Sequence, residues 1–102
     1  QINLDLAVDP KTSMKKLETI INQVGKAVAD DPELKNEIIE APKFVRVSDF
    51  TGNSITIKIM GKTTGGQQLE IKSIFYRKLK NAFDKEGIKL AVLPTQYQQT
   101  KK

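Results

Sequence analysis

The chain has 102 residues and a formal net charge of +5, with 38% apolar and 28% charged residues. This balance is typical of one folded domain rather than of a disordered or fibrous chain. Cysteine and histidine are both absent, which excludes disulfides, thiol nucleophiles, imidazole bases and zinc or haem sites built on those side chains. The longest apolar run, residues 90–93, is far shorter than the roughly 20 residues that cross a bilayer. The start lacks an initiator methionine and the regions of a signal peptide, so we expect a domain from within a longer protein.

The positive charge is concentrated in the second part of the chain. Residues 1–41 hold five lysines and eight acids, a net charge of −3, whereas residues 42–102 hold twelve basic residues and four acids, a net charge of +8. A basic segment is typical of proteins that bind nucleic acid, anionic lipid or anionic solutes. Lysines on solvated helix and strand surfaces produce the same charge pattern, and we favour that interpretation.

The first elements are a strand and an amphipathic helix. Strict alternation of apolar and polar residues over 2–8 predicts a half-buried strand, which Pro10 would end because proline cannot continue a strand ladder. Apolar residues at steps of three and four over 14–28 predict a helix with one buried stripe. Thr12 or Ser13 is expected to cap the start of this helix, since a hydroxyl there accepts a free backbone N–H.

The chain from Pro32 to the second strand is harder to assign. Pro32 ends the first helix because the residue before a proline avoids the helical region. We expect a short second helical piece over residues 33–40, closed by Pro42, and then a strand over residues 44–50. In that strand the alternation predicts that Val45 and Val47 lie on one face and that Phe44, Arg46 and Ser48 lie on the other.

A hairpin and a second long helix follow. Residues 51–54 contain Gly and Asn and predict a tight turn. Alternating isoleucines over residues 55–60 predict a third strand, and residues 61–66 predict a polar loop. The apolar side of residues 67–85 predicts a helix that Gly87 ends as a C-cap.

A fourth short strand is expected over residues 88–92, terminated by Pro94. The resulting order predicts an α+β fold, the ferredoxin-like βαββαβ sandwich, in which two helices cover one face of a four-stranded antiparallel sheet. We expect one domain over residues 1–95 and a polar, disordered tail over residues 96–102. The uncovered sheet face is predicted to be polar and wet. It would carry Asn3, Asp5, Arg46, Ser48, Thr56 and Lys58.

No pattern of a catalytic, cofactor or metal site is apparent, so we expect no enzyme and no cofactor. The tripeptide at 61–63 resembles the end of a P-loop, but Thr56 stands where that motif needs glycine, and a loop rather than a helix follows. The acids of residues 30–40 lack the glycine-centred pattern of a calcium loop. None of the four serines at 13, 48, 54 and 73 has a histidine base or a nucleophile elbow.

A stand-alone ferredoxin-like module that binds nucleic acid or a small regulatory ligand is the alternative function. RNA-recognition domains stack bases on aromatic side chains of their central strands. The predicted central strand, residues 53–59, has no aromatic residue, and the basic residues of 72–85 would contact phosphates only non-specifically.

Three stretches, taken in order and spacing, resemble one family over about residues 1–95. They are EAPKFVRVSDF at 40–50, NSITIKI at 53–59, and KNAFDKEGIKL at 80–90 followed by Pro94. This pattern is similar to the carboxy-terminal α/β domain of the small-conductance mechanosensitive channel (MscS) family. The resemblance implies a soluble cytoplasmic vestibule domain of a homo-oligomeric channel that relieves osmotic pressure. It also implies other copies of the chain as partners, ions and small solutes as cargo, no specific nucleic acid, and a location at the cytoplasmic side of the cell membrane.

The resemblance also implies a place for the basic residues. Family vestibules have side portals, and a positive potential at a portal would enrich anions there. Lys58, Lys62 and Lys72 are our candidates for residues that face a portal.

Overall fold

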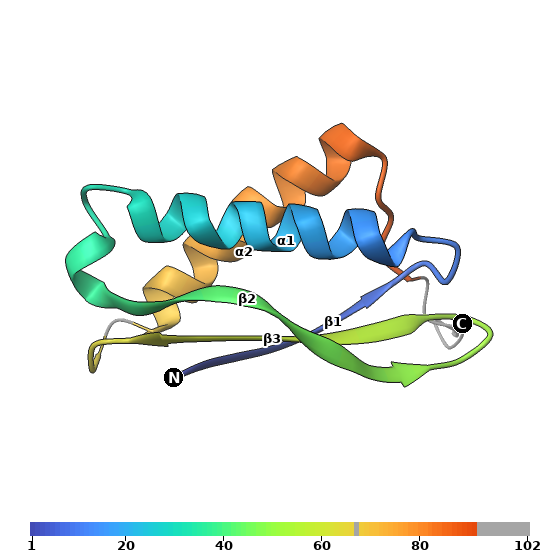
Figure 1. Ribbon diagram of the computed structural model, residues 1–102, viewed down its shortest axis with the longest axis horizontal. Coiled ribbons are helices and arrows are strands. Elements are labelled where there is room, and N and C mark those ends of the chain that lie inside the picture. The colour runs from blue at the N-terminus through green and yellow to red at the C-terminus, as the bar shows by residue number, and fades with distance from the viewer. Residues whose placement is uncertain (67, 92–102) are drawn as a thin grey trace, which may run out of the picture.

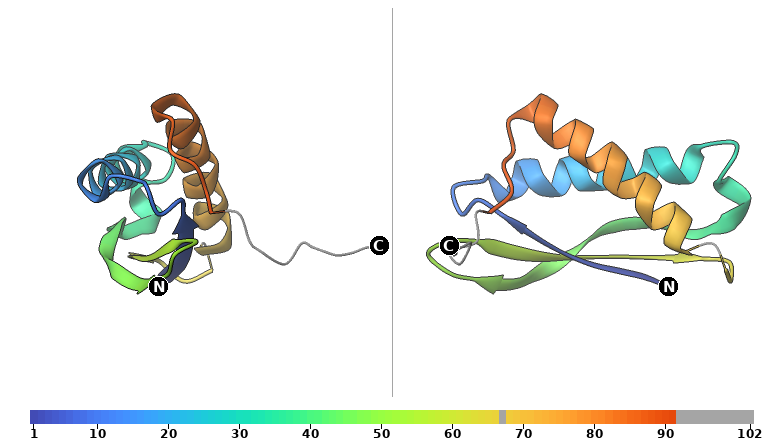
Figure 2. Two further views of the ribbon diagram at one scale, coloured as in Figure 1. Left: turned by 90° about the vertical axis from the view of Figure 1, so that its right-hand side faces the viewer. Right: turned by 180° about the vertical axis from the view of Figure 1, so that it is seen from behind.

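The computed structural model describes residues 1–66 and 68–91 and has two layers, a sheet and a pair of helices on one of its faces (Figure 1). Seen from the end, α1 lies above β2 and α2 lies above β1 (Figure 2, left). The α+β class, with two helices against an antiparallel sheet, is confirmed. The elements are β1 (Ile2–Val8), α1 (Met14–Asp30), the 3-10 helix η1 (Lys35–Glu37), β2 (Ile38–Phe50), β3 (Ile55–Thr63) and α2 (Gln68–Glu86).

The most apolar strand is the central one. The sheet order is β1-β3-β2, and both neighbours run antiparallel to β3. Ile55, Ile57 and Ile59 of β3 are buried beneath the helices, as expected for a strand that is paired on both sides and covered on one face. Phe75 of α2 is completely buried in the same core.

Capping residues set the helix ends as predicted. The Oγ of Ser13 accepts the backbone N–H of Lys16 at 3.3 Å, which satisfies one of the free donors of the first turn of α1. Gly87 has a φ of +74°, a left-handed conformation that glycine adopts without strain. The N–H of Ile88 then donates to the carbonyl of Phe83 at 2.9 Å, which closes the C-terminus of α2.

The helix layer approaches the sheet closely at Gly25 of α1. A Cβ atom at this position would lie 1.8 Å from the carbonyl oxygen of Pro42 in β2. Gly61 lies on the neighbouring strand β3, and a Cβ there would meet the backbone of Glu40 and Pro42 at 3.0 Å. Two glycines therefore make room for a fully buried proline of β2 where α1 packs on the sheet.

The predicted helical piece over residues 33–40 is wrong except for a short turn at its centre. Only Lys35–Glu37 form a helical turn, and β2 begins at Ile38. Pro42 does not interrupt the strand because it lies in a bulge of an edge strand, where no ladder hydrogen bond needs its missing N–H.

The predicted polar loop over residues 61–66 begins later than predicted. Residues 61–63 continue β3, because the early part of β2 pairs with them, Ile38 opposite Thr63 and Glu40 opposite Lys62. The backbone N–H of Thr64 also donates to the carbonyl of Glu37 at 2.8 Å. The longer β3 is thus a consequence of the longer β2.

The predicted faces of the second strand are also wrong. Phe44 packs against the core, whereas Val45 and Val47 are exposed. Bulges at Val45 and Ser48 interrupt the alternation, so that Phe44, Val47 and Phe50 all lie opposite buried isoleucines of β3. The side-chain Oδ1 of Asn22 on α1 accepts the N–H of Phe44 at 2.9 Å beside the first bulge.

The fourth strand of the predicted ferredoxin-like sheet is not present as a strand in the described residues. They contain a single bridge, between Leu90 and Val8, and the described sheet has three strands. Val92, Pro94 and the predicted tail at 96–102 lie outside the described residues.

Candidate functional site

The open face of the sheet carries an ion pair at its centre. Nζ of Lys58 on β3 lies 3.4 Å from Oδ1 of Asp5 on β1 and donates to Oδ1 of Asn3 at 3.0 Å. The Lys58 side chain is only 19% exposed, so it is largely covered by its neighbours. This face is polar, as predicted, and these contacts tie β1 to β3 across it.

The three predicted portal lysines do not form one cluster. Lys58 and Lys62 both lie on β3 and point to the open face, because they alternate with buried residues. Lys72 is half-buried on α2, which covers the opposite face of the sheet. The structure therefore brings two of the three candidates onto one surface, and Lys62 is the more exposed of these two.

The aromatic residues of the sheet do not lie on its open face. Phe44 and Phe50 are opposite Ile59 and Ile55 in the register of β2 and β3, which places both on the helix side. Among the residues that the structure describes, the strands present no aromatic side chain to the open face. The exposed aromatic side chains on which RNA-recognition sheets stack bases are therefore absent from the described part of this open face.

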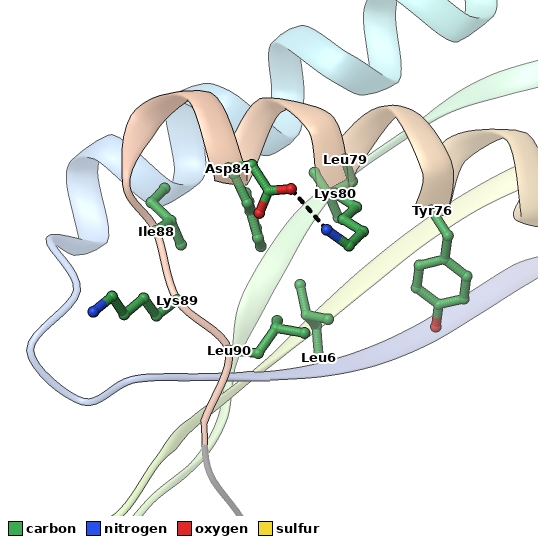
Figure 3. Close-up of a pocket in the computed structure, with 9 residues that line it drawn as sticks. Leu6, Tyr76, Leu79, Lys80, Asp84, Ile88, Lys89 and Leu90 are labelled. Carbon is green, nitrogen blue, oxygen red and sulfur yellow. Dashed lines mark hydrogen bonds and ion pairs between the residues drawn. The ribbon is translucent and has the colours of Figure 1, made fainter.

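An apolar groove lies between α2, β1 and the segment that follows α2 (Figure 3). We call it the edge groove; its volume is about 600 Å³. On its rim Lys80 and Asp84 form an ion pair with a distance of 2.7 Å between Nζ and Oδ2. The residues that line it are Leu6, Tyr76, Leu79, Lys80, Phe83, Asp84, Ile88, Lys89 and Leu90. Sequence analysis missed this groove, because it forms only where the chain returns from α2 to the edge of β1.

Tyr76 stands at one end of the edge groove, and its side chain reaches from α2 toward β1 (Figure 3). Partial burial raises the pKa of the Tyr76 phenol, since the phenolate loses hydration there, and the negative charge of Asp5 raises this pKa further.

This raised pKa predicts a loss of stability in alkali. The folded chain keeps the Tyr76 proton at a pH where the unfolded chain has lost it, so this contribution is complete below about pH 10 and falls as the pH rises beyond that value. In Tyr76→Phe the free energy of unfolding should fall less steeply. Urea unfolding of both proteins from roughly pH 8 to 11 measures this difference. Parallel curves would show that Tyr76 titrates alike in both states.

The described residues contain neither a cluster of metal-binding side chains nor a helix that could cross a membrane. Within residues 1–66 and 68–91, acidic side chains do not gather into a group of three or more that could hold a metal ion. In the same two ranges, the helices are too short or too polar to span a bilayer.

Comparison with known proteins identifies the family. The family model for the C-terminal domain of the mechanosensitive ion channel MscS matches residues 2–90, which confirms the resemblance seen in the three sequence stretches. No curated protein gives a significant match. Because the matched region includes every described helix and strand, the chain belongs to the family of C-terminal domains of MscS mechanosensitive channels.

Proposed function

We propose that this chain is part of the wall of the cytoplasmic vestibule in a homo-oligomeric mechanosensitive channel. In that role it helps to hold the copies together and influences which solutes reach the pore when the channel relieves osmotic pressure. The observation that carries the proposal is the family match over residues 2–90. The absence of any catalytic arrangement in the sequence supports a structural role rather than an enzymatic one.

We also propose that the sheet of this domain extends to the ferredoxin-like order. The Leu90–Val8 bridge lies on the edge of β1 that β3 leaves free. Two backbone bonds flank it, from Asp9 N–H to the Lys89 carbonyl at 2.9 Å and from Ala91 N–H to the Ala7 carbonyl at 3.1 Å. These bonds have the antiparallel pattern with which a fourth strand would begin.

The channel role predicts pressure-activated currents that depend on the basic residues. The protein that carries this domain would be reconstituted in liposomes and recorded under suction, with a salt gradient across the patch. We expect Lys62→Glu and Lys72→Glu to lower the anion-to-cation permeability ratio at least about two-fold, because each copy of the subunit exchanges a positive for a negative charge.

A charge-neutral change provides the matched control. Asp5→Asn combined with Lys58→Gln removes the ion pair on the open face without altering the net charge, so the permeability ratio should stay unchanged. The single variant Lys58→Glu should lower the ratio, as expected of a portal residue. A reversal potential that none of the three lysine reversals changes would contradict the filtering role, and a protein without pressure-activated current would contradict the channel role.

A further inference from the structure

The described chain ends beside the edge groove. Leu90 bridges to Val8 on the free edge of β1, and the described residues end at Ala91. Figure 3 shows Leu90 and Leu6 between β1 and α2, where both line the groove. Leu90 keeps 54% of its surface exposed, so the groove is open at the point where the described chain ends.

The bonds beside the bridge set the register in which a strand would continue. The two backbone bonds that flank the bridge make Val8 and Leu90 a non-hydrogen-bonded pair of an antiparallel ladder. In such a ladder, each step beyond Leu90 is matched by one step along β1 toward its start. Val92 is therefore the residue that would come opposite Leu6.

Alternation along the strand then decides which side chain reaches the groove. Leu90 and Val92 are two positions apart, so they belong to the same face. For Leu90 this is the face on which it lines the groove together with Leu6. Leu93 belongs to the other face and would come opposite Asp5, on the open side of the sheet.

Pro94 is compatible with the same register. It would come opposite Leu4 in another non-hydrogen-bonded pair, in which the backbone N–H of an edge residue points away from the neighbouring strand. The missing N–H of a proline at this position therefore loses no bond to β1. A proline there also discourages a further strand from pairing with the outer edge.

We propose that residues 92–94 of the same chain cover the edge groove, with Val92 packed against Leu6 between β1 and α2. This proposal rests on the fourth strand proposed above and adds what that strand does. A groove of about 600 Å³ is in the size range of small-molecule sites, so its occupant decides its role. Covered by Val92, the groove is part of the core, and a small regulatory ligand, the alternative function, loses it as a site. The charges of Lys80 and Asp84 on the rim already neutralise each other.

Two adjacent substitutions in the full 102-residue chain test this placement. Val92→Ala should raise the equilibrium constant of unfolding at least about ten-fold, because it removes buried methyl groups and leaves a cavity. Leu93→Ala is the matched control and should change this constant less than about three-fold, since its side chain belongs to the open face. Urea unfolding of both variants and the unchanged chain measures the three constants. The opposite order of the two effects would overturn the proposal, because it would place Leu93 in the groove.

Two measurements on the unchanged chain do not depend on a variant that folds. The N–H of Leu93 would donate to the carbonyl of Asp5, so it should exchange with solvent at least about ten times more slowly than the N–H of Val92, which points away from β1. The dye ANS binds exposed apolar surface. Its addition should leave the amide NMR signals of Leu79 and Phe83 unshifted, because the groove that they line is covered.

The outcomes separate the covered groove from the fourth strand on which it rests. Slow exchange at Leu93 together with equal effects of the two alanine variants would keep the strand and overturn the coverage. Shifts of Leu79 and Phe83 on addition of ANS would overturn it too, since an open groove then accepts a small ligand. An unfolding midpoint that rises with protein concentration in the unchanged chain but not in Val92→Ala would overturn it in favour of a second copy. Rapid exchange at Leu93 would reject both the strand and the coverage.

Discussion

Replacement of Gly25 by alanine is expected to lower the free energy of unfolding by about 3 kcal/mol, although alanine is the better helix former by about 1 kcal/mol. The reason is the contact between the layers, since the added methyl group would lie 1.8 Å from the carbonyl oxygen of Pro42. Pro42 is fully buried in β2, and the atom that the methyl group would meet is backbone rather than the end of a flexible side chain. The helix would therefore have to move away from the sheet, which would open the core beneath it.

The matched control lies half a turn further along the same helix. Ala27 is exposed, so Ala27→Gly should lose only the helix preference, about 1 kcal/mol. Urea unfolding of both variants and the unchanged chain measures the three stabilities. If Gly25→Ala proves more stable than the unchanged chain, the close approach of α1 to Pro42 is wrong.

Truncation of Phe75 to alanine should be the most damaging single change in the core. The ring is completely buried on α2 and belongs to the same cluster as the β3 isoleucines. Its removal loses the transfer free energy of the ring and leaves a cavity, and such changes cost about 3–5 kcal/mol. A domain of this size has a total stability of roughly 5–15 kcal/mol, so the variant should be marginally folded at best.

Leu69 provides the comparison for Phe75, because it lies on the same helix with 78% of its surface exposed. Leu69→Ala should change the free energy of unfolding by less than about 0.5 kcal/mol. Circular dichroism during urea unfolding reports both values. Equal losses of unfolding free energy in the two variants would mean that α2 does not pack on the sheet with Phe75 facing the core.

The same two variants connect folding with the channel role proposed above. Under the proposed channel role, Phe75→Ala should reduce the number of assembled channels, since an unfolded domain presents no folded surface to other copies. Leu69→Ala should leave assembly intact, because the fold does not depend on this exposed side chain.

Local patterns in the sequence were sufficient to predict the helices and strands that bury one regular face. The alternation in β1 and β3, the helical stripe of α1 and the C-cap at Gly87 are all present as predicted. Each of these signals depends on residues a few positions apart, and burial of one face repeats with the period of the element itself. The family was recognisable for the same reason, from three strand and helix stretches in fixed order.

Tertiary structure alone decided the features that depend on partners distant in sequence. The start of β2 at Ile38 follows from its pairing with the end of β3, and bulges rather than alternation decide that Val47 and Phe50 share a face. The ion pair of Lys58 with Asp5 and the edge groove both join residues more than fifty positions apart. Sequence periodicity carries no information about which strand lies alongside, where its register shifts or which backbone passes closest. These are properties of pairs of elements, and they are determined only when the core packs.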